Sequence, residues 1–125
     1  MSDKKKIIII DDEPDIVTFL TVLLQDNGYE TISAGNGREG LETIRAERPD
    51  LVLLDITMPE KSGVRCYREM RENPDLKPIP IVIVTGVAKD FKNFISTRRQ
   101  VPPPDGFVEK PIDQQGRDRQ SDQAP

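Results

Sequence analysis

Several polar residues that could bind a metal or take part in catalysis stand directly after short apolar runs. They are Asp11 and Asp12 after the first run, Asp55 after a second, Thr85 after a third and Lys110 near the end of the chain. Carboxylates provide the oxygen ligands that Mg²⁺ prefers, and a carboxylate can also act as a nucleophile. A hydroxyl and an ammonium group can hold the remaining oxygens of a phosphoryl group. These side chains therefore suggest metal-assisted phosphoryl transfer, provided that the fold brings them together.

Each of these residues also has an ordinary structural explanation. Acids followed by Pro14 are typical of a helix start. Asp55 alone can cap its own backbone in a loop, and Thr85 alone is an unremarkable residue at a strand end. A single lysine such as Lys110 is most often a surface residue. Their joint occurrence at successive strand ends favours a shared site.

The chain has no histidine and one cysteine. The absence of histidine excludes a Ser-His-Asp triad, a zinc site with histidine ligands and a histidine phosphodonor within this chain. One cysteine cannot form an internal disulfide, and a reducing compartment fits this composition. We expect Cys66 to be a packing residue of a helix.

The length and the net charge of the chain further limit the classes of protein to which it can belong. The 125 residues favour one domain, and the net charge of −4 argues against direct DNA binding, which usually requires a basic surface. The four isoleucines of residues 7–10 are too few for the apolar part of a signal peptide. No apolar run is long enough to span a membrane. We therefore expect a cytoplasmic protein without membrane association.

Strand and helix patterns alternate along the chain. Short apolar or β-branched runs predict strands at residues 7–10, 29–34, 51–54, 79–84 and 106–109. Helical patterns predict helices at residues 14–25, 38–47, 64–72 and 89–99. In the first helix, the residues predicted to face the sheet are Ile16, Leu20, Leu23 and Leu24. Such alternation predicts an α/β doubly wound parallel sheet, in which ligands bind beyond the carboxyl ends of the strands.

Four segments carry a resemblance to a known family: IIIIDDEPDI, LVLLDITMPEKSG, IPIVIVTG and FVEKP. Over residues 5–112 the chain resembles the CheY-like receiver domain of bacterial two-component response regulators. The resemblance implies a flavodoxin-like five-stranded sheet in the order 2-1-3-4-5. It also implies a phosphorylation-dependent signalling switch that is not an enzyme, although it assists its own phosphorylation and dephosphorylation. A sensor histidine kinase or phosphotransfer protein would supply the phosphoryl group, and a downstream protein would be the target.

The resemblance also implies a role for each matching residue. Asp55 corresponds to the phosphoacceptor, and Gly63 to a glycine of the loop that follows it. The Mg²⁺ ligands would be Asp11, Asp12, Asp55 and the backbone carbonyl of Thr57. Thr85 and Lys110 would contact the phosphoryl group, and Thr85 and Phe107 would form the switch.

The end of the chain departs from the family pattern. We expect a receiver domain at residues 1–112 and a disordered or irregular polar tail at residues 113–125, where Ala124 is the only apolar residue. The fifth helix of the family is therefore predicted to be missing or degenerate. Its absence would expose part of one sheet face, and we hypothesise that a homodimer covers it.

Two other functions compete with the switch. Haloacid-dehalogenase-like phosphatases also use an aspartyl nucleophile after a strand, but they need a second acid two residues later, where this chain has Thr57. A degenerate receiver would act as a protein-interaction module without phosphorylation. The complete set of acceptor residues argues against this second alternative.

Overall fold

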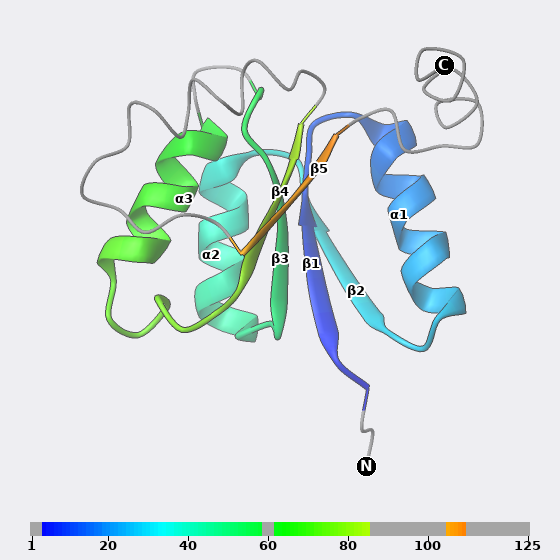
Figure 1. The fold of residues 1–125 in the computed structure, drawn as a ribbon, viewed down its shortest axis with the longest axis horizontal. Coiled ribbons are helices and arrows are strands. Elements are labelled where there is room, and N and C mark those ends of the chain that lie inside the picture. The colour runs from blue at the N-terminus through cyan, green and yellow to red at the C-terminus, as the bar shows by residue number, and fades with distance from the viewer. Residues whose placement is uncertain (1–3, 59–61, 86–104, 110–125) are drawn as a thin grey trace.

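The structure, a computed structural model, describes residues 4–58, 62–85 and 105–109 (Figure 1). Within them, five parallel strands alternate with helices. The strands are β1 (Lys6–Ile10), β2 (Glu30–Ala34), β3 (Leu51–Asp55), β4 (Ile81–Thr85) and β5 (Gly106–Glu109). The helices are α1 (Pro14–Asp26), α2 (Gly37–Glu47) and α3 (Ser62–Glu72). The strand order is β2-β1-β3-β4-β5, which confirms the predicted doubly wound sheet.

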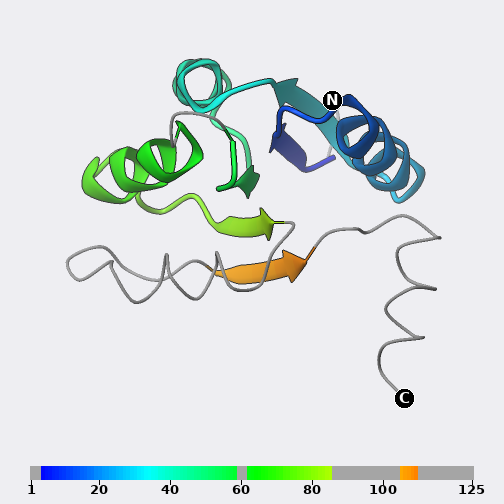
Figure 2. The ribbon, with the colours of Figure 1, turned by 90° about the horizontal axis from the view of Figure 1, so that it is seen from above.

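The sheet lies between two layers of helix. Figure 2 shows α1 on one face and α2 with α3 on the other. A strand covered on both faces needs apolar side chains in both directions, which explains why the strands are continuous apolar runs without alternation. The crossover connections leave every strand pointing the same way, so all carboxyl ends reach one edge of the sheet.

The main core lies between the sheet and the α2–α3 layer. Its strand residues are Ile8, Ile10, Val52, Leu54, Ile81 and Ile83, each with no exposed surface. Its helix residues include Leu41, Ile44, Cys66, Tyr67 and Met70. The predicted packing role of Cys66 is confirmed, because this side chain is only 2% exposed.

Two sequence-based expectations need correction. The strand predicted at residues 79–84 begins at Ile81, because Ile79 donates its N–H to the carbonyl of Leu76 in a turn (3.0 Å). Pro80 then has no N–H to give to a strand ladder. The expected inward position of Leu23 is also wrong: this residue is 45% exposed, whereas Leu20 of the same helix is buried.

Other expectations fall outside the described residues. They concern the helix at residues 89–99, the tail at residues 113–125 and the fifth helix. Within the parts that the structure describes, no helix has the length and apolar character needed to cross a membrane.

Local capping explains where α2 starts and stops. The side chain of Asn36 accepts a hydrogen bond from the N–H of Glu39 (2.9 Å), which caps the first turn. Arg48 adopts a left-handed conformation with φ of 49° after the last turn, and its N–H donates to the carbonyl of Ile44 (2.9 Å). The chain then turns directly into β3, whose carboxyl end carries Asp55.

Candidate functional site

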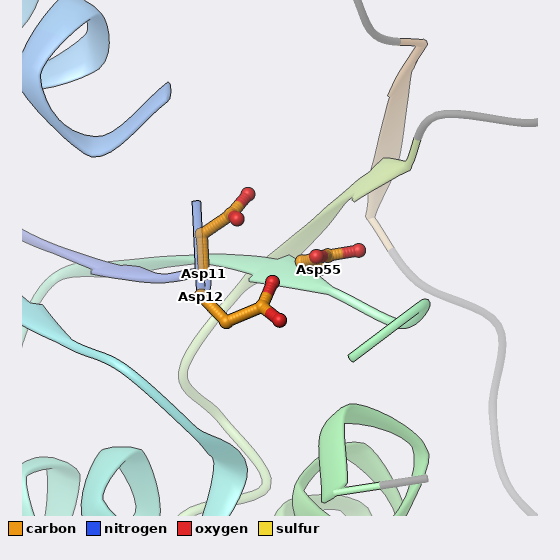
Figure 3. A group of neighbouring side chains, drawn as sticks. All are labelled: Asp11, Asp12 and Asp55. Carbon is orange, nitrogen blue, oxygen red and sulfur yellow. The ribbon is translucent and has the colours of Figure 1, made fainter. Parts of the chain in front are cut away.

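Three carboxylates meet at the carboxyl-terminal edge of the sheet. Strands β1 and β3 are neighbours, and Ile10 pairs with Leu54. Asp11, which follows the end of β1, therefore lies close to Asp55, the last residue of β3. One carboxylate oxygen from each of Asp11, Asp12 and Asp55 lies within 4.8 Å of the other two (Figure 3). The sequence analysis suggested a shared site if the fold brings these acids together, and the structure meets that condition.

The three acids differ in their exposure to solvent. Asp11 is 3% exposed and Asp55 is 1% exposed, whereas Asp12 is an exposed residue. Asp11 also organises the turn into α1, because its Oδ1 accepts the N–H of Glu13 (2.9 Å) and its own N–H donates to the carbonyl of Ala34 (3.1 Å). The cluster therefore has two buried members held by the fold and one member that faces water.

The carboxylate of Asp55 is held by the residue two positions later. Its Oδ1 accepts hydrogen bonds from the N–H of Thr57 (2.8 Å) and from the hydroxyl of Thr57 (2.6 Å). Both bonds are charge-assisted, and the second has the short length that is typical of a hydroxyl donor and a carboxylate. Thr57 itself is exposed, so its hydroxyl lies between a buried acid and the solvent.

Close backbone contacts hold the start of α3 against the end of β3. A Cβ atom added to Gly63 would overlap the carbonyl oxygen of Asp55, so the start of α3 packs directly on the backbone of this acid. On its other side, the hydroxyl of Ser62 accepts the N–H of Gly37 (3.1 Å), and a Cβ atom at Gly37 would overlap the backbone of Ser62. The first turns of α2 and α3 therefore interlock beside the carboxylates.

The structure also gives backbone positions for two further predicted residues. Thr85 ends β4, one residue after Val84, which pairs with Asp55. Phe107 lies in β5 and pairs with Ile83. Lys110 lies outside the described residues.

A groove of about 690 Å³ runs between α2 and α3 and reaches Asp12. Gly37, Leu41 and Cys66 are the buried residues in its lining. Burial raises the pKa of the Cys66 thiol to about 12, and the nearby charge of Glu69 acts in the same direction. This thiol is therefore protonated at neutral pH and cannot act as a nucleophile beside the acids.

The sequence did not predict the hydrogen bond from the hydroxyl of Thr57 to Oδ1 of Asp55. A threonine two residues after an aspartate often makes local hydrogen bonds, and this pattern was the available signal. The buried Arg71 was missed as well. Its Nη2 lies 2.8 Å from Oδ2 of Asp105, at the opposite end of the sheet from the carboxylates. No local pattern marks an arginine whose partner is so distant in the sequence.

The donor set fits a hard divalent cation. Three carboxylates in one place repel one another, and a cation such as Mg²⁺ relieves this repulsion while taking oxygen ligands. Carboxylate oxygens within 4.8 Å of each other can contact one ion. The geometry can thus support chemistry in which an acid and a metal act on the same phosphoryl group.

Comparisons with known proteins agree with this geometry. The family model of the response regulator receiver domain matches residues 7–116. The chain is 31% identical to protein PilH of Pseudomonas aeruginosa over 110 residues, which cover 88% of each chain. It is 33% identical to protein Rrf1 of Nitratidesulfovibrio vulgaris over 108 residues, which cover 86% of this chain and 73% of that protein.

Solved structures show the same likeness. The signal receiver domain of a signal transduction histidine kinase from Syntrophus aciditrophicus superposes with a TM-score of 0.74 at 31% identity. The alignment covers 87% of this chain and 80% of that chain. The N-terminal domain of a response regulator receiver protein from Methanoculleus marisnigri has a TM-score of 0.71 at 28% identity, with 96% and 92% of the two chains covered.

Proposed function

This chain belongs to the response regulator receiver domain family, and from that membership we propose that Asp55 is its phosphoacceptor in a Mg²⁺-dependent signalling switch. One observation carries the proposal: oxygens of Asp11, Asp12 and Asp55 lie within 4.8 Å of one another at the carboxyl edge of the sheet. A family member that had lost phosphorylation would have no need to keep three mutually repelling acids together.

In the proposed reaction, Asp55 is the nucleophile and the neighbouring groups hold the metal ion. An oxygen of Asp55 attacks the phosphorus of the donor, a new P–O bond forms, and the bond from phosphorus to the donor atom breaks. The donor leaves with the electron pair of that bond. Asp11, Asp12, Asp55 and the carbonyl of Thr57 would hold Mg²⁺, which neutralises charge on the phosphoryl oxygens when it is bound.

Two residues at neighbouring strand ends complete the proposal. The hydroxyl of Thr85 and the ammonium group of Lys110 would bind the transferred phosphoryl group, which brings about two negative charges. The movement of Thr85 toward these charges would let Phe107 change its position. A local electrostatic change would thereby alter the surface that a partner protein recognises.

The proposed partners follow from this chemistry. Since the chain has no histidine, a sensor histidine kinase or a phosphotransfer protein would act as the donor. A downstream protein would read the phosphorylated state, and a second copy of the chain is a further proposed partner. We place the receiver at residues 1–112 and residues 113–125 outside it.

Intact-mass measurement tests the proposal directly. The purified chain is treated with a small acyl phosphate in the presence of Mg²⁺, and we expect it to gain the mass of one phosphoryl group. The gain should disappear when Mg²⁺ is chelated and in the Asp55→Asn variant, which keeps the size of the side chain but lacks the nucleophilic oxygen. Retention of the added mass in Asp55→Asn would contradict the assignment of the acceptor.

The same experiment separates the competing functions. If the wild-type chain gains no mass, the degenerate interaction module is the better description. Continuous turnover of a phosphomonoester without a stable adduct would instead indicate a phosphatase.

A further inference from the structure

We propose that the hydroxyl of Thr57 is a latch on Oδ1 of Asp55 that must open before this oxygen can bind Mg²⁺ or accept a phosphoryl group. This inference rests on the proposed function and deepens it, because it names a positioning residue that regulates the acceptor. Its basis is the pair of hydrogen bonds from the N–H (2.8 Å) and the hydroxyl (2.6 Å) of Thr57 to the same oxygen.

The two donors together saturate this oxygen. A carboxylate has about four lone-pair sites, two on each oxygen. On Oδ1 of Asp55 both sites are used by Thr57, one by a backbone group and one by a side chain. A metal ion or a phosphorus atom that approaches Oδ1 must therefore displace one of these donors.

The hydroxyl is the donor that can leave. The N–H of Thr57 belongs to the backbone that follows Asp55, and the contact with Gly63 restrains this backbone at the carbonyl oxygen of Asp55. The side chain of Thr57 belongs to an exposed residue, so it can rotate about its Cα–Cβ bond and donate to water instead. Asp55 is 1% exposed and has no comparable freedom.

Opening the latch has an energetic cost that metal binding must meet. A hydrogen bond to a charged group is stronger than one between neutral groups, and this bond has the short length of that class. A residue without the hydroxyl therefore lowers the cost of ligation at Oδ1. Valine is the matched replacement, since it keeps the branched shape of threonine, and serine keeps the hydroxyl while losing the methyl group.

Calorimetric titration with Mg²⁺ tests the latch without any phosphorylation. Three proteins are compared: the wild-type chain, Thr57→Val and Thr57→Ser. We expect Thr57→Val to bind Mg²⁺ roughly 10- to 150-fold more tightly than wild type, which is the range set by the loss of one charge-assisted hydrogen bond. We expect Thr57→Ser to stay within about twofold of wild type, because its hydroxyl restores the bond.

The rate of phosphorylation by a small acyl phosphate, measured at saturating Mg²⁺, provides a second readout. We expect Thr57→Val to react faster than the other two proteins. Thermal unfolding of all three chains checks that their folds are equally stable.

The outcomes distinguish the latch from the proposed function. Equal Mg²⁺ affinities for the three proteins, or weaker binding by Thr57→Val, would overturn the latch even if the wild-type chain is phosphorylated normally. If none of the three proteins binds Mg²⁺ or gains a phosphoryl group, the latch and the proposed function both fail. The latch is supported if Thr57→Val binds Mg²⁺ more tightly than both the wild-type chain and Thr57→Ser.

Discussion

At the scale of single residues, the main feature of the site is a group of three aspartates at the carboxyl-terminal edge of the sheet. Asp11 and Asp55 are almost wholly buried, and Asp12 faces solvent within the same 4.8 Å group. Their mutual repulsion destabilises the folded chain when no cation is present. The site is therefore a place where function and stability oppose each other.

Removal of one charge should stabilise the metal-free fold. We expect Asp12→Asn to raise the unfolding temperature without Mg²⁺ by roughly 2–4 °C, because the two buried acids lose a repelling neighbour. The same variant should gain less stability from added Mg²⁺, because it lacks one of the proposed ligands. Thermal unfolding followed by circular dichroism, with and without Mg²⁺, measures both effects.

Asp15→Asn is the matched control for this variant. Asp15 is an exposed acid in the first turn of α1, where a negative charge is favourable. Its removal should not raise the unfolding temperature or alter the response to Mg²⁺. A rise in both variants would show that the net charge, and not the cluster, is responsible.

A methyl group at Gly63 should damage the site and the fold together. Gly63→Ala introduces a Cβ atom onto the carbonyl oxygen of Asp55. We expect a loss of about 1–3 kcal/mol in the free energy of unfolding, which is typical of overpacking, and weaker Mg²⁺ binding. Urea unfolding and calorimetric titration provide the two measurements.

Gly35→Ala is the comparison for this substitution. A Cβ atom at Gly35 would have no heavy atom within 4 Å, apart from its chain neighbours, so the same chemical change should cost little there. Equal losses of stability for the two variants would contradict the contact between α3 and the backbone of Asp55.

Helix α3 links the two ends of the sheet at the scale of secondary structure elements. Its first turn packs on Asp55, and its last turn carries Arg71, whose side chain is 7% exposed. Nη2 of Arg71 donates to Oδ2 of Asp105 (2.8 Å), and Nη1 donates to the carbonyl of Lys77 (3.0 Å). Oδ2 of Asp105 also accepts the N–H of Ile81 (2.8 Å). One carboxylate therefore ties β4 and the start of β5 to α3.

We expect low pH to weaken the contacts that Asp105 makes with Arg71 and Ile81, because its carboxylate becomes protonated. Burial of Asp105 acts to raise its pKa, but the hydrogen bond from Ile81 and the ion pair with Arg71 outweigh it, so the pKa lies below its ordinary value of 3.8. A carboxyl group with a lower pKa in the folded state stabilises the fold above its unfolded pKa. That contribution is lost as the pH falls from about 4 through the folded pKa.

The Asp105→Asn variant measures this contribution. We expect it to be less stable than wild type at pH 7, and the difference to shrink as the pH is lowered below about 4. Urea unfolding at several pH values gives the comparison. Asp75→Asn, at an exposed acid that no ion pair in the described part of the chain includes, is the control. A difference from wild type that does not change with pH would count against the ion pair with Arg71.

The two faces of the sheet are unequally covered at the scale of the whole molecule. On the α2–α3 face, Leu54 and Ile83 have no exposed surface. On the α1 face, their neighbours in the same strands, Leu53 and Val82, are only half-buried. The proposal of self-association concerns this second face, because partly exposed aliphatic side chains in a sheet favour contact with another surface.

Size-exclusion chromatography with light scattering tests the self-association. We expect the mass to rise above that of one chain as the concentration approaches the high micromolar range. Leu53→Lys should keep the chain monomeric, whereas Asp75→Lys, outside the sheet, should not. A wild-type chain that stays monomeric at these concentrations would contradict the proposal.

The sequence by itself determined the strands, the helices α1 to α3 and the chemical types at the strand ends. These features depend on local properties, namely the length of an apolar run, its period and the residue that follows it. Asp55 stands after Leu54 whatever the rest of the chain does. The strand order came from the family resemblance, since no local signal specifies which strands become neighbours.

Only the tertiary structure decided which of these groups meet and how. The convergence of Asp11, Asp12 and Asp55 requires β1 and β3 to pair, and the burial of Arg71 requires α3 to lie beside the start of β5. The exposure of Leu23 depends on how α1 lies on the sheet, which a helical period cannot specify. Contacts between distant segments set these properties, because burial and hydrogen-bond geometry depend on neighbours in space and not on neighbours in sequence.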